Sequence, residues 1–214
     1  MNMQGGCASR YNIKRLIILL VLFSGAEQKV VAQNTATTDF LVLITGDTLY
    51  GDVEHIHEKG VHPYFYKKIR LTMASGKRKK FKSALVASFK NDGSVYESFW
   101  LSQSADMSTL FSSRYNIDPI NGKQHFLKVI TKGKLSHYHL EWFEQGDAAL
   151  NYMDLVKKEE QSYFLRATQG IFGIKSKLLL SYFSNCPDLR QKIEGKQFKK
   201  VEQIVDFYNH HCAF

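Results

Sequence analysis

The chain has 214 residues, of which 44% are hydrophobic and 13% aromatic, and its formal net charge is +9. A disordered chain would be poorer in both residue classes, so this composition indicates a globular protein. The length gives room for one compact domain, or for one domain and a small appendage. The positive charge favours acidic partners without naming one.

Residues 1–32 have the three parts of a secretory signal peptide. Basic residues between Arg10 and Arg15 precede the apolar run LIILLVLFSGA, and small residues suited to cleavage stand at Ala26 and Ala32. The alternative is an uncleaved membrane anchor, but a bilayer span needs roughly 20 apolar residues. We therefore expect a protein that is periplasmic, associated with the outer membrane or secreted, with no transmembrane span after cleavage. Both cleavage points remain open.

Residues 39–170 carry the alternating pattern and the turn signals of β-strands. DFLVLITGDTLYGDV predicts two strands around TGD, and NDG predicts a turn between LVASFK and SVYESFWL. FLKVITKGKLSHYHLEWF and YMDLVKKEEQSYFLRA each predict a further hairpin. Residues 102–124 are rich in serine, asparagine and glycine, which predicts a loop.

The densest charge lies in KKIRLTMASGKRKKFK, residues 67–82, which predicts two strands around ASGK. This segment has no acidic residue and eight basic ones, which are Lys67, Lys68, Arg70, Lys77, Arg78, Lys79, Lys80 and Lys82. Such a hairpin is suited to an anionic polymer, for example lipopolysaccharide, an acidic glycan or a phospholipid surface. The alternative needs no partner, since lysines on an exposed edge strand prevent pairing with other chains. We expect no nucleic-acid partner, because the protein is exported.

Two histidine pairs stand at alternate strand positions, His55 with His57 and His137 with His139. This spacing puts both imidazoles of a pair on one sheet face, and the four would converge on a metal if the strands were neighbours. That arrangement is the basis of an alternative function, a metal-dependent hydrolase. Glu141 shares a face with the second pair, and the opposite face is apolar. This pattern favours His137 and His139 facing solvent, with no metal bound.

Helical period begins near Lys175 and characterises residues 171–214. Pro187 suits the first position of a helix, where its missing N–H would have no partner, and Gly195 suits its end. From Gln197 onward, apolar residues recur at spacings of three and four, which predicts a second helix. We therefore expect a helical hairpin that packs on or beside the sheet.

Signal cleavage would leave two cysteines, Cys186 and Cys212. In an exported protein this pair predicts a disulfide, and the two antiparallel helices would bring the cysteines side by side. The alternative is a zinc site that adds His210 and His211. Three consecutive residues cannot easily all reach one tetrahedral metal, so the disulfide is favoured.

Several segments of the chain resemble a family of small exported proteins from Bacteroidetes-type bacteria. The segments are GDTLYGDV, KKIRLTMASGKRKKF, FLKVITKGKLSHYHLEW and YFSNCPDL…VDFYNHHC. The family has no assigned activity. The resemblance implies export, a β-rich body and a helical end, and it supplies no catalytic residues.

Together these patterns predict an α+β protein, with an antiparallel sheet or small open barrel of hairpins followed by a helical hairpin. The chain has no G-x-S-x-G elbow, no glycine-rich phosphate loop and no cysteine free to attack. These absences favour a non-enzymatic binding or structural module over an enzyme, and we expect no cofactor. The predicted partner is an anionic envelope polymer or another envelope protein.

Overall fold

The computed structural model describes residues 39–56, 68–103, 113–143, 150–168 and 173–212. All of them belong to one compact unit, Thr37–Phe214. The predicted signal peptide, His57 and Lys67 lie outside the described residues. None of the helices in the described part is long and apolar enough to cross a membrane.

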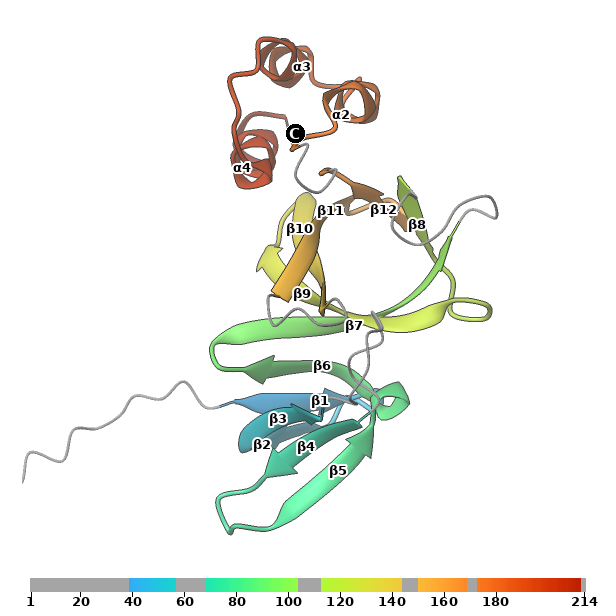
Figure 1. Ribbon diagram of the computed structural model, residues 1–214, viewed down its shortest axis with the longest axis vertical. Coiled ribbons are helices and arrows are strands. Elements are labelled where there is room, and N and C mark those ends of the chain that lie inside the picture. Colours follow the sequence, from blue (N-terminus) through green and yellow to red (C-terminus); the bar gives the residue numbers. More distant parts are fainter. Residues whose placement is uncertain (1–38, 57–67, 104–112, 144–149, 169–172, 213–214) are drawn as a thin grey trace, which may run out of the picture. The chain divides into compact units, whose positions relative to one another are not determined.

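The described chain is a succession of strands that ends in helices (Figure 1). The strands are β1 (Phe40–Leu43), β2 (Thr48–Tyr50), β3 (Asp52–Ile56), β4 (Lys68–Thr72), β5 (Arg78–Lys82), β6 (Val86–Asn91), β7 (Ser94–Gln103), β8 (Arg114–Ile117), β9 (Lys123–Thr131), β10 (Leu135–Phe143), β11 (Leu150–Lys158) and β12 (Tyr163–Arg166). The helices are α2 (Ser176–Tyr182), α3 (Pro187–Glu194) and α4 (Val201–His211), and a 3-10 turn η1 (Ser83–Leu85) precedes β6. The predicted antiparallel β-rich body and helical end are confirmed.

Six strands close into a barrel because β7 has partners along both edges. The larger sheet has the order β2-β1-β6-β7-β8-β12-β11-β10-β9, and β7 pairs with β9 as well. The first residues of β7 pair with β6, and its last residues pair with β8 on the same edge. The other edge of β7 is therefore free to meet β9. The barrel is closed, where the sequence predicted an open barrel or an open sheet.

Apolar and aromatic side chains from all six barrel strands form one buried cluster. Its buried members are Leu101, Tyr115, Leu127, Tyr138, Leu140, Met153, Leu155 and Phe164. Because side chains alternate along a strand, residues between these positions on β10 and β11 lie on the outer face of the barrel. The outer residues include the predicted histidines His137 and His139.

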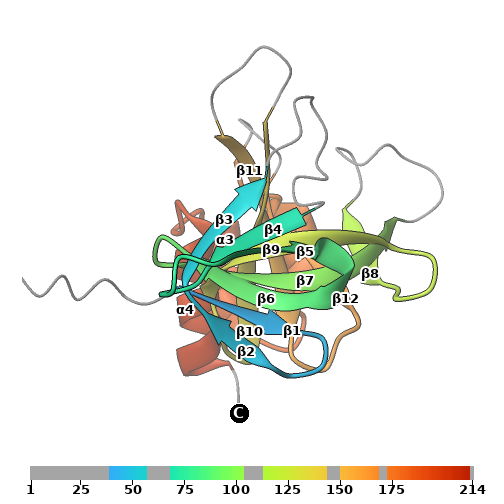
Figure 2. The ribbon, with the colours of Figure 1, turned by 90° about the horizontal axis from the view of Figure 1, so that it is seen from below.

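A separate three-stranded sheet, β3-β4-β5, packs against β1 and β6, the part of the larger sheet that lies outside the barrel. In Figure 2 this small sheet lies in front of the larger one. Val53, Leu71 and Phe81 from this sheet share one buried cluster with Leu41 and Phe89 from β1 and β6. One face of β4 and β5 is therefore apolar and buried. Most basic side chains of β4 and β5 project from the opposite face.

The three helices cover the outer face of the barrel at β10, β11 and β12. Leu135, Val156 and Leu165 from these strands share a buried cluster with side chains from all three helices. The side chain of Asn209 in α4 accepts a hydrogen bond from the backbone N–H of Leu135 and donates one to its carbonyl oxygen, at 2.8 and 2.9 Å. Gly133 is needed beside this contact, because a Cβ there would lie 2.7 Å from the Asn209 side chain.

The predicted Cys186–Cys212 disulfide is present, with the two Cα atoms 5.7 Å apart. It joins the N-cap of α3 to the C-cap of α4. Because the two sulfurs are bonded to each other, they are not available to a zinc site with His210 and His211. The helical end has three helices where the sequence predicted a hairpin, since α2 packs into the same cluster.

The predicted loop at residues 102–124 contains a strand. β8 spans Arg114–Ile117 and pairs with β12 and with the end of β7. Its four residues RYNI are too few to show an alternating pattern, and only Tyr115 among them is buried. Long-range pairing, which local sequence does not report, makes this segment a strand.

Candidate functional site

The basic segment forms the outer face and the edge of the three-stranded sheet. Ile69, Leu71 and Phe81 are buried, so the alternate residues of β4 and β5 project from the opposite face. We call this set the basic face, and it consists of Lys68, Arg70, Arg78, Lys80 and Lys82. β5 is the edge strand of its sheet, as the predicted protection of an edge requires.

Cations stand directly opposite cations across the basic face. Lys68 is paired with Lys82, and Arg70 with Lys80. Within the described residues, the acidic side chain that contacts this set is Glu54, which accepts a hydrogen bond from Arg70 at 2.6 Å. Like charges directly opposite each other on a sheet are destabilising. Among the described residues Glu54 compensates Arg70, and most of the positive charge of the face is left without such a partner.

The other basic residues of the segment lie beside this face. Lys77 stands in the exposed turn between β4 and β5. Lys79 projects from the same face of β5 as Phe81, and its Nζ lies 5.0 Å from the centre of that ring. Lys67 lies outside the described residues. The basic segment is thus concentrated on one face and one edge.

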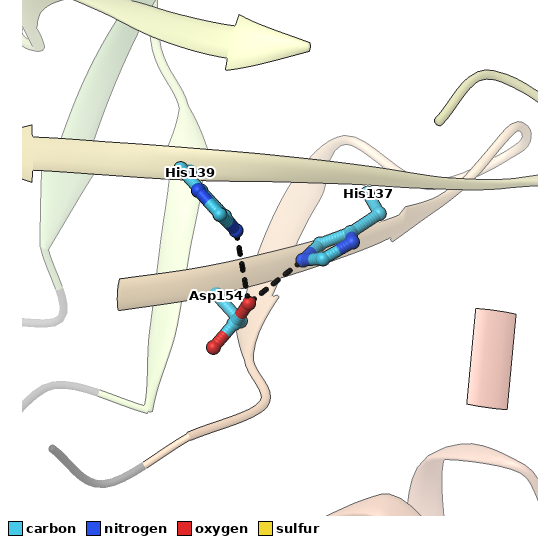
Figure 3. A group of neighbouring side chains, drawn as sticks. All are labelled: His137, His139 and Asp154. Atoms are coloured by element: carbon cyan, nitrogen blue, oxygen red, sulfur yellow. Dashed lines mark hydrogen bonds and ion pairs between the residues drawn. The ribbon is translucent and has the colours of Figure 1, made fainter. Parts of the chain in front are cut away.

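A second polar group lies on the outer face of the barrel, where β10 pairs with β11. His139 is directly opposite Asp154, and His137 is opposite the next but one residue, Val156. Nε2 of His137 lies 2.9 Å from Oδ1 of Asp154, and Nε2 of His139 lies 3.2 Å from the same oxygen. Figure 3 shows both imidazoles turned toward that oxygen. We call His137, His139 and Asp154 the His–Asp cluster.

The His–Asp cluster is largely shielded from solvent. The side chain of His137 is fully buried, that of His139 is 14% exposed and that of Asp154 is 11% exposed. Tyr152 stacks on the His139 ring, with the ring centres 4.2 Å apart. Burial raises the pKa of the Asp154 carboxyl group, but the facing imidazoles and the Thr168 hydroxyl outweigh burial and hold this pKa well below its usual range. Asp154 is therefore negatively charged at physiological pH.

A groove opens beside the cluster, between β11 and the start of α4. Its volume is about 600 Å³, and Asp154 and Tyr152 line it on the β11 side. The exposed residues Lys199 and Lys200, just before α4, line it as well. The carboxylate of Asp154 thus faces both the two imidazoles and a groove with basic residues.

The structure places the three described members of the predicted histidine pairs in two different sheets. His55 lies in β3, opposite Ile69 of β4, whereas His137 and His139 lie in β10 between β9 and β11. β3 and β10 are therefore not neighbours, and His57 lies outside the described residues. The expectation that His137 and His139 face solvent is wrong, because the helices and Tyr152 cover that part of the barrel.

Sequence reasoning missed Asp154 as the residue that completes the cluster. It stands between Met153 and Leu155, which are both buried in the barrel. An acidic residue inside an otherwise apolar strand pattern is a signal for a partnered carboxylate. Finding its partners also required the register of β11 on β10, which the segment between these strands does not predict.

No family model, curated protein or solved structure matches the chain. Inferences about function therefore depend on the geometry of the basic face and of the His–Asp cluster.

Proposed function

We propose that the protein is an exported, non-enzymatic envelope protein that binds an anionic polymer through the basic face. The observation that carries the proposal is the pairing of Lys68 with Lys82 and of Arg70 with Lys80 across two strands. Edge protection alone requires charged residues on β5, but it gives no reason for cations opposite them on the interior strand β4. An anionic ligand lying across both strands would remove the repulsion.

The spacing of the charges suits a repeating ligand better than a single small ion. Successive residues on one face of a strand are about 6.7 Å apart, and neighbouring strands are about 4.8 Å apart. The basic face thus presents rows of charge along and across two strands, which an extended anionic polymer can contact at several points at once. Such contacts give an affinity that falls as salt rises, because exposed charges are screened.

Export is supported by the signal-peptide pattern and by the disulfide. Disulfides form and persist in oxidising compartments outside the cytosol. The described part of the chain contains the Cys186–Cys212 bond. An envelope location would bring the basic face to lipopolysaccharide or an acidic glycan, and the resemblance to exported Bacteroidetes-type proteins agrees with this location.

Charge reversal on β5 tests the proposal without harming the sheet. In the variant Arg78→Glu, Lys80→Glu, Lys82→Glu, two of the new carboxylates stand opposite Arg70 and Lys68, so favourable pairs replace repulsive ones. We expect the variant to fold at least as stably and to lose binding to immobilised lipopolysaccharide at low salt. The control reverses three exposed basic residues elsewhere, Lys134, Lys177 and Arg190, and should keep most of the binding. Equal binding by the β5 variant and the wild type would refute the proposal.

A further inference from the structure

The His–Asp cluster leaves two buried nitrogens without a hydrogen bond among the described residues, Nδ1 of His137 and Nε2 of His139, and the second of them faces Asp154. Oδ1 of Asp154 accepts a hydrogen bond from Nε2 of His137, whereas the His139 contact, at 3.2 Å, lacks hydrogen-bond geometry. Nε2 of His139 is buried and has no hydrogen-bond partner within the described residues. A buried polar group without a partner is destabilising. Hydrogen bonding alone therefore does not account for the convergence of two imidazoles on one carboxylate oxygen.

A metal ion would satisfy all three groups at once. Zinc bonds to imidazole nitrogen and carboxylate oxygen at about 2.0–2.2 Å, which places tetrahedral ligand atoms about 3.3 Å apart. The two nitrogen–oxygen distances in the cluster are 2.9 and 3.2 Å, and one ligand atom from each of the three residues lies within 4.8 Å of the others. The two nitrogen–oxygen distances are thus close to those between ligand atoms around a bound zinc ion.

We propose that His137, His139 and Asp154 bind a zinc ion that keeps one coordination position open to the groove, where it takes an anionic ligand. Two imidazoles and a carboxylate are a donor set that proteins use for zinc, and the same set also binds iron(II). We name zinc because the distances in the cluster match those between the ligand atoms of a tetrahedral zinc ion. Three protein ligands leave the fourth tetrahedral position to water or another ligand. Of the three residues Asp154 lines the groove, which puts the groove beside the proposed ion, and we infer that the open position faces that space.

The charges around the groove select the class of ligand. Zinc with one carboxylate ligand carries a net charge of about +1. Lys199 and Lys200 add two positive charges at the groove, and Glu202 contributes one negative charge. The resulting excess of positive charge favours a phosphate or carboxylate group over a neutral molecule.

The surroundings of the cluster hold its residues in place. β10 and β11 are paired without interruption from Leu135 to Phe143, so the ligands stand on rigid strands and not on loops. The ring of Tyr152 stacks on His139, and the Thr168 hydroxyl accepts a hydrogen bond from the backbone N–H of Asp154 at 3.1 Å. Such supporting contacts are what orients metal ligands in proteins.

The proposal is independent of the basic face, which lies on a different sheet. It differs from the predicted hydrolase site, because Asp154 takes the place of His55 and His57. A zinc ion with an open position can activate water, which is the chemistry that a metal-dependent hydrolase needs. The proposal itself concerns the metal and its anionic ligand.

Zinc titration of the metal-stripped protein tests the site. We expect isothermal titration calorimetry to show one tight zinc per chain, and elemental analysis to confirm that stoichiometry. His139→Gln and Asp154→Asn should each weaken this binding by about 100-fold. The loss of a residue that only supports a metal ligand can already weaken binding by this factor, so the loss of a ligand should cost at least as much. The matched control His210→Gln, His211→Gln removes exposed helix histidines and should leave the affinity unchanged. Circular dichroism checks that each variant folds. If Asp154→Asn does not fold, the His139→Gln variant still tests the proposal, because the His139 side chain is less deeply buried than that of His137.

Cobalt substitution tests the open position and the ligand class. The wild type loaded with Co²⁺ should show the absorption of four-coordinate cobalt, and inorganic phosphate should change it. Lys199→Gln, Lys200→Gln should weaken the phosphate response without changing zinc affinity. A wild type that binds no zinc, or a His139→Gln variant that binds it as tightly, would overturn the metal site. A cobalt spectrum that does not respond to phosphate would overturn the open position.

Discussion

Two antiparallel strand pairs in this protein carry polar side chains on one face, but the two faces have opposite properties. On β4 and β5 the polar face is open to solvent, and Lys68 and Arg70 stand opposite further cations. On β10 and β11 the polar face is covered, and a carboxylate stands opposite an imidazole. The comparison shows that alternation assigns a side chain to a face of the sheet. Whether that face is covered by other elements then decides whether its polar side chains stay in solvent or pair with one another.

The helical end makes the difference between the two faces. α2, α3 and α4 form one buried cluster with β10, β11 and β12. Lys158 at the end of β11 extends into the helices, where its Nζ donates hydrogen bonds to the carbonyl oxygen of Tyr182 and to Oδ1 of Asn185. The described residues place no comparable layer over the outer face of β4 and β5.

Removing the disulfide should have the largest effect and should act on the covered region. The loop between Cys186 and Cys212 spans 26 residues, so the bond contributes about 3 kcal/mol to the free energy of unfolding in the chain-entropy model. We expect urea unfolding of Cys186→Ser, Cys212→Ser to show a loss of that size. Reductant should destabilise the wild type similarly and leave the variant unchanged. A wild type whose stability does not respond to reductant would contradict this expectation.

A pair of carboxylate-to-amide substitutions should separate the covered face from the open one. Asp154→Asn weakens charged hydrogen bonding in a buried cluster, so we expect it to lower the metal-free free energy of unfolding by about 2 kcal/mol. Glu54→Gln removes the salt bridge to Arg70, whose side chains are 48% and 29% exposed, and should cost less than about 1 kcal/mol. Both are measured by urea unfolding in the presence of a chelator. Equal losses would show that the helical cover does not matter.

A third carboxylate, that of Asp118, tests the effect of backbone hydrogen bonds apart from deep burial. Its substitution should have the smallest effect on the free energy of unfolding. The backbone N–H groups of Asn121 and Ile120 donate to Oδ1 of Asp118, at 2.9 and 3.1 Å. The Asn121 hydrogen bond is the main cause of a lowered pKa for Asp118, and it outweighs the partial burial of the group, which raises the pKa. A lowered folded pKa gives stability that is present above about pH 4, the unfolded value, and is lost as pH falls through the folded value.

An NMR titration of the Asp118 carboxyl group checks this expectation directly. Its midpoint should lie below that of an unstructured aspartate. The stability advantage of the wild type over Asp118→Asn should shrink as the pH is lowered from 7 to 3. A midpoint at or above the unstructured value would show that the backbone hydrogen bonds do not hold the carboxylate.

Much of the architecture was predictable where the signal is local. The period-two pattern predicted the β-rich body, and Pro187 and Gly195 predicted α3, whose structure begins at that proline. The cysteine pair could be predicted because the expected export and the helix ends both indicated it. Neither β8 nor the closure of the barrel could be predicted, because both depend on pairing between segments that are distant in the chain.

The sequence by itself determined which residues share a face, namely the cations of β4 and β5 and the two histidines of β10. Only the tertiary structure decided that the first face stays open and that the second is covered and joined by Asp154. The physical reason is that periodicity is a property of neighbouring residues, whereas cover is made by distant ones. The hydrogen bonds between Asn209 and Leu135, which are 74 residues apart, bring α4 onto the barrel. That packing turns an alternating pair of histidines into a buried cluster.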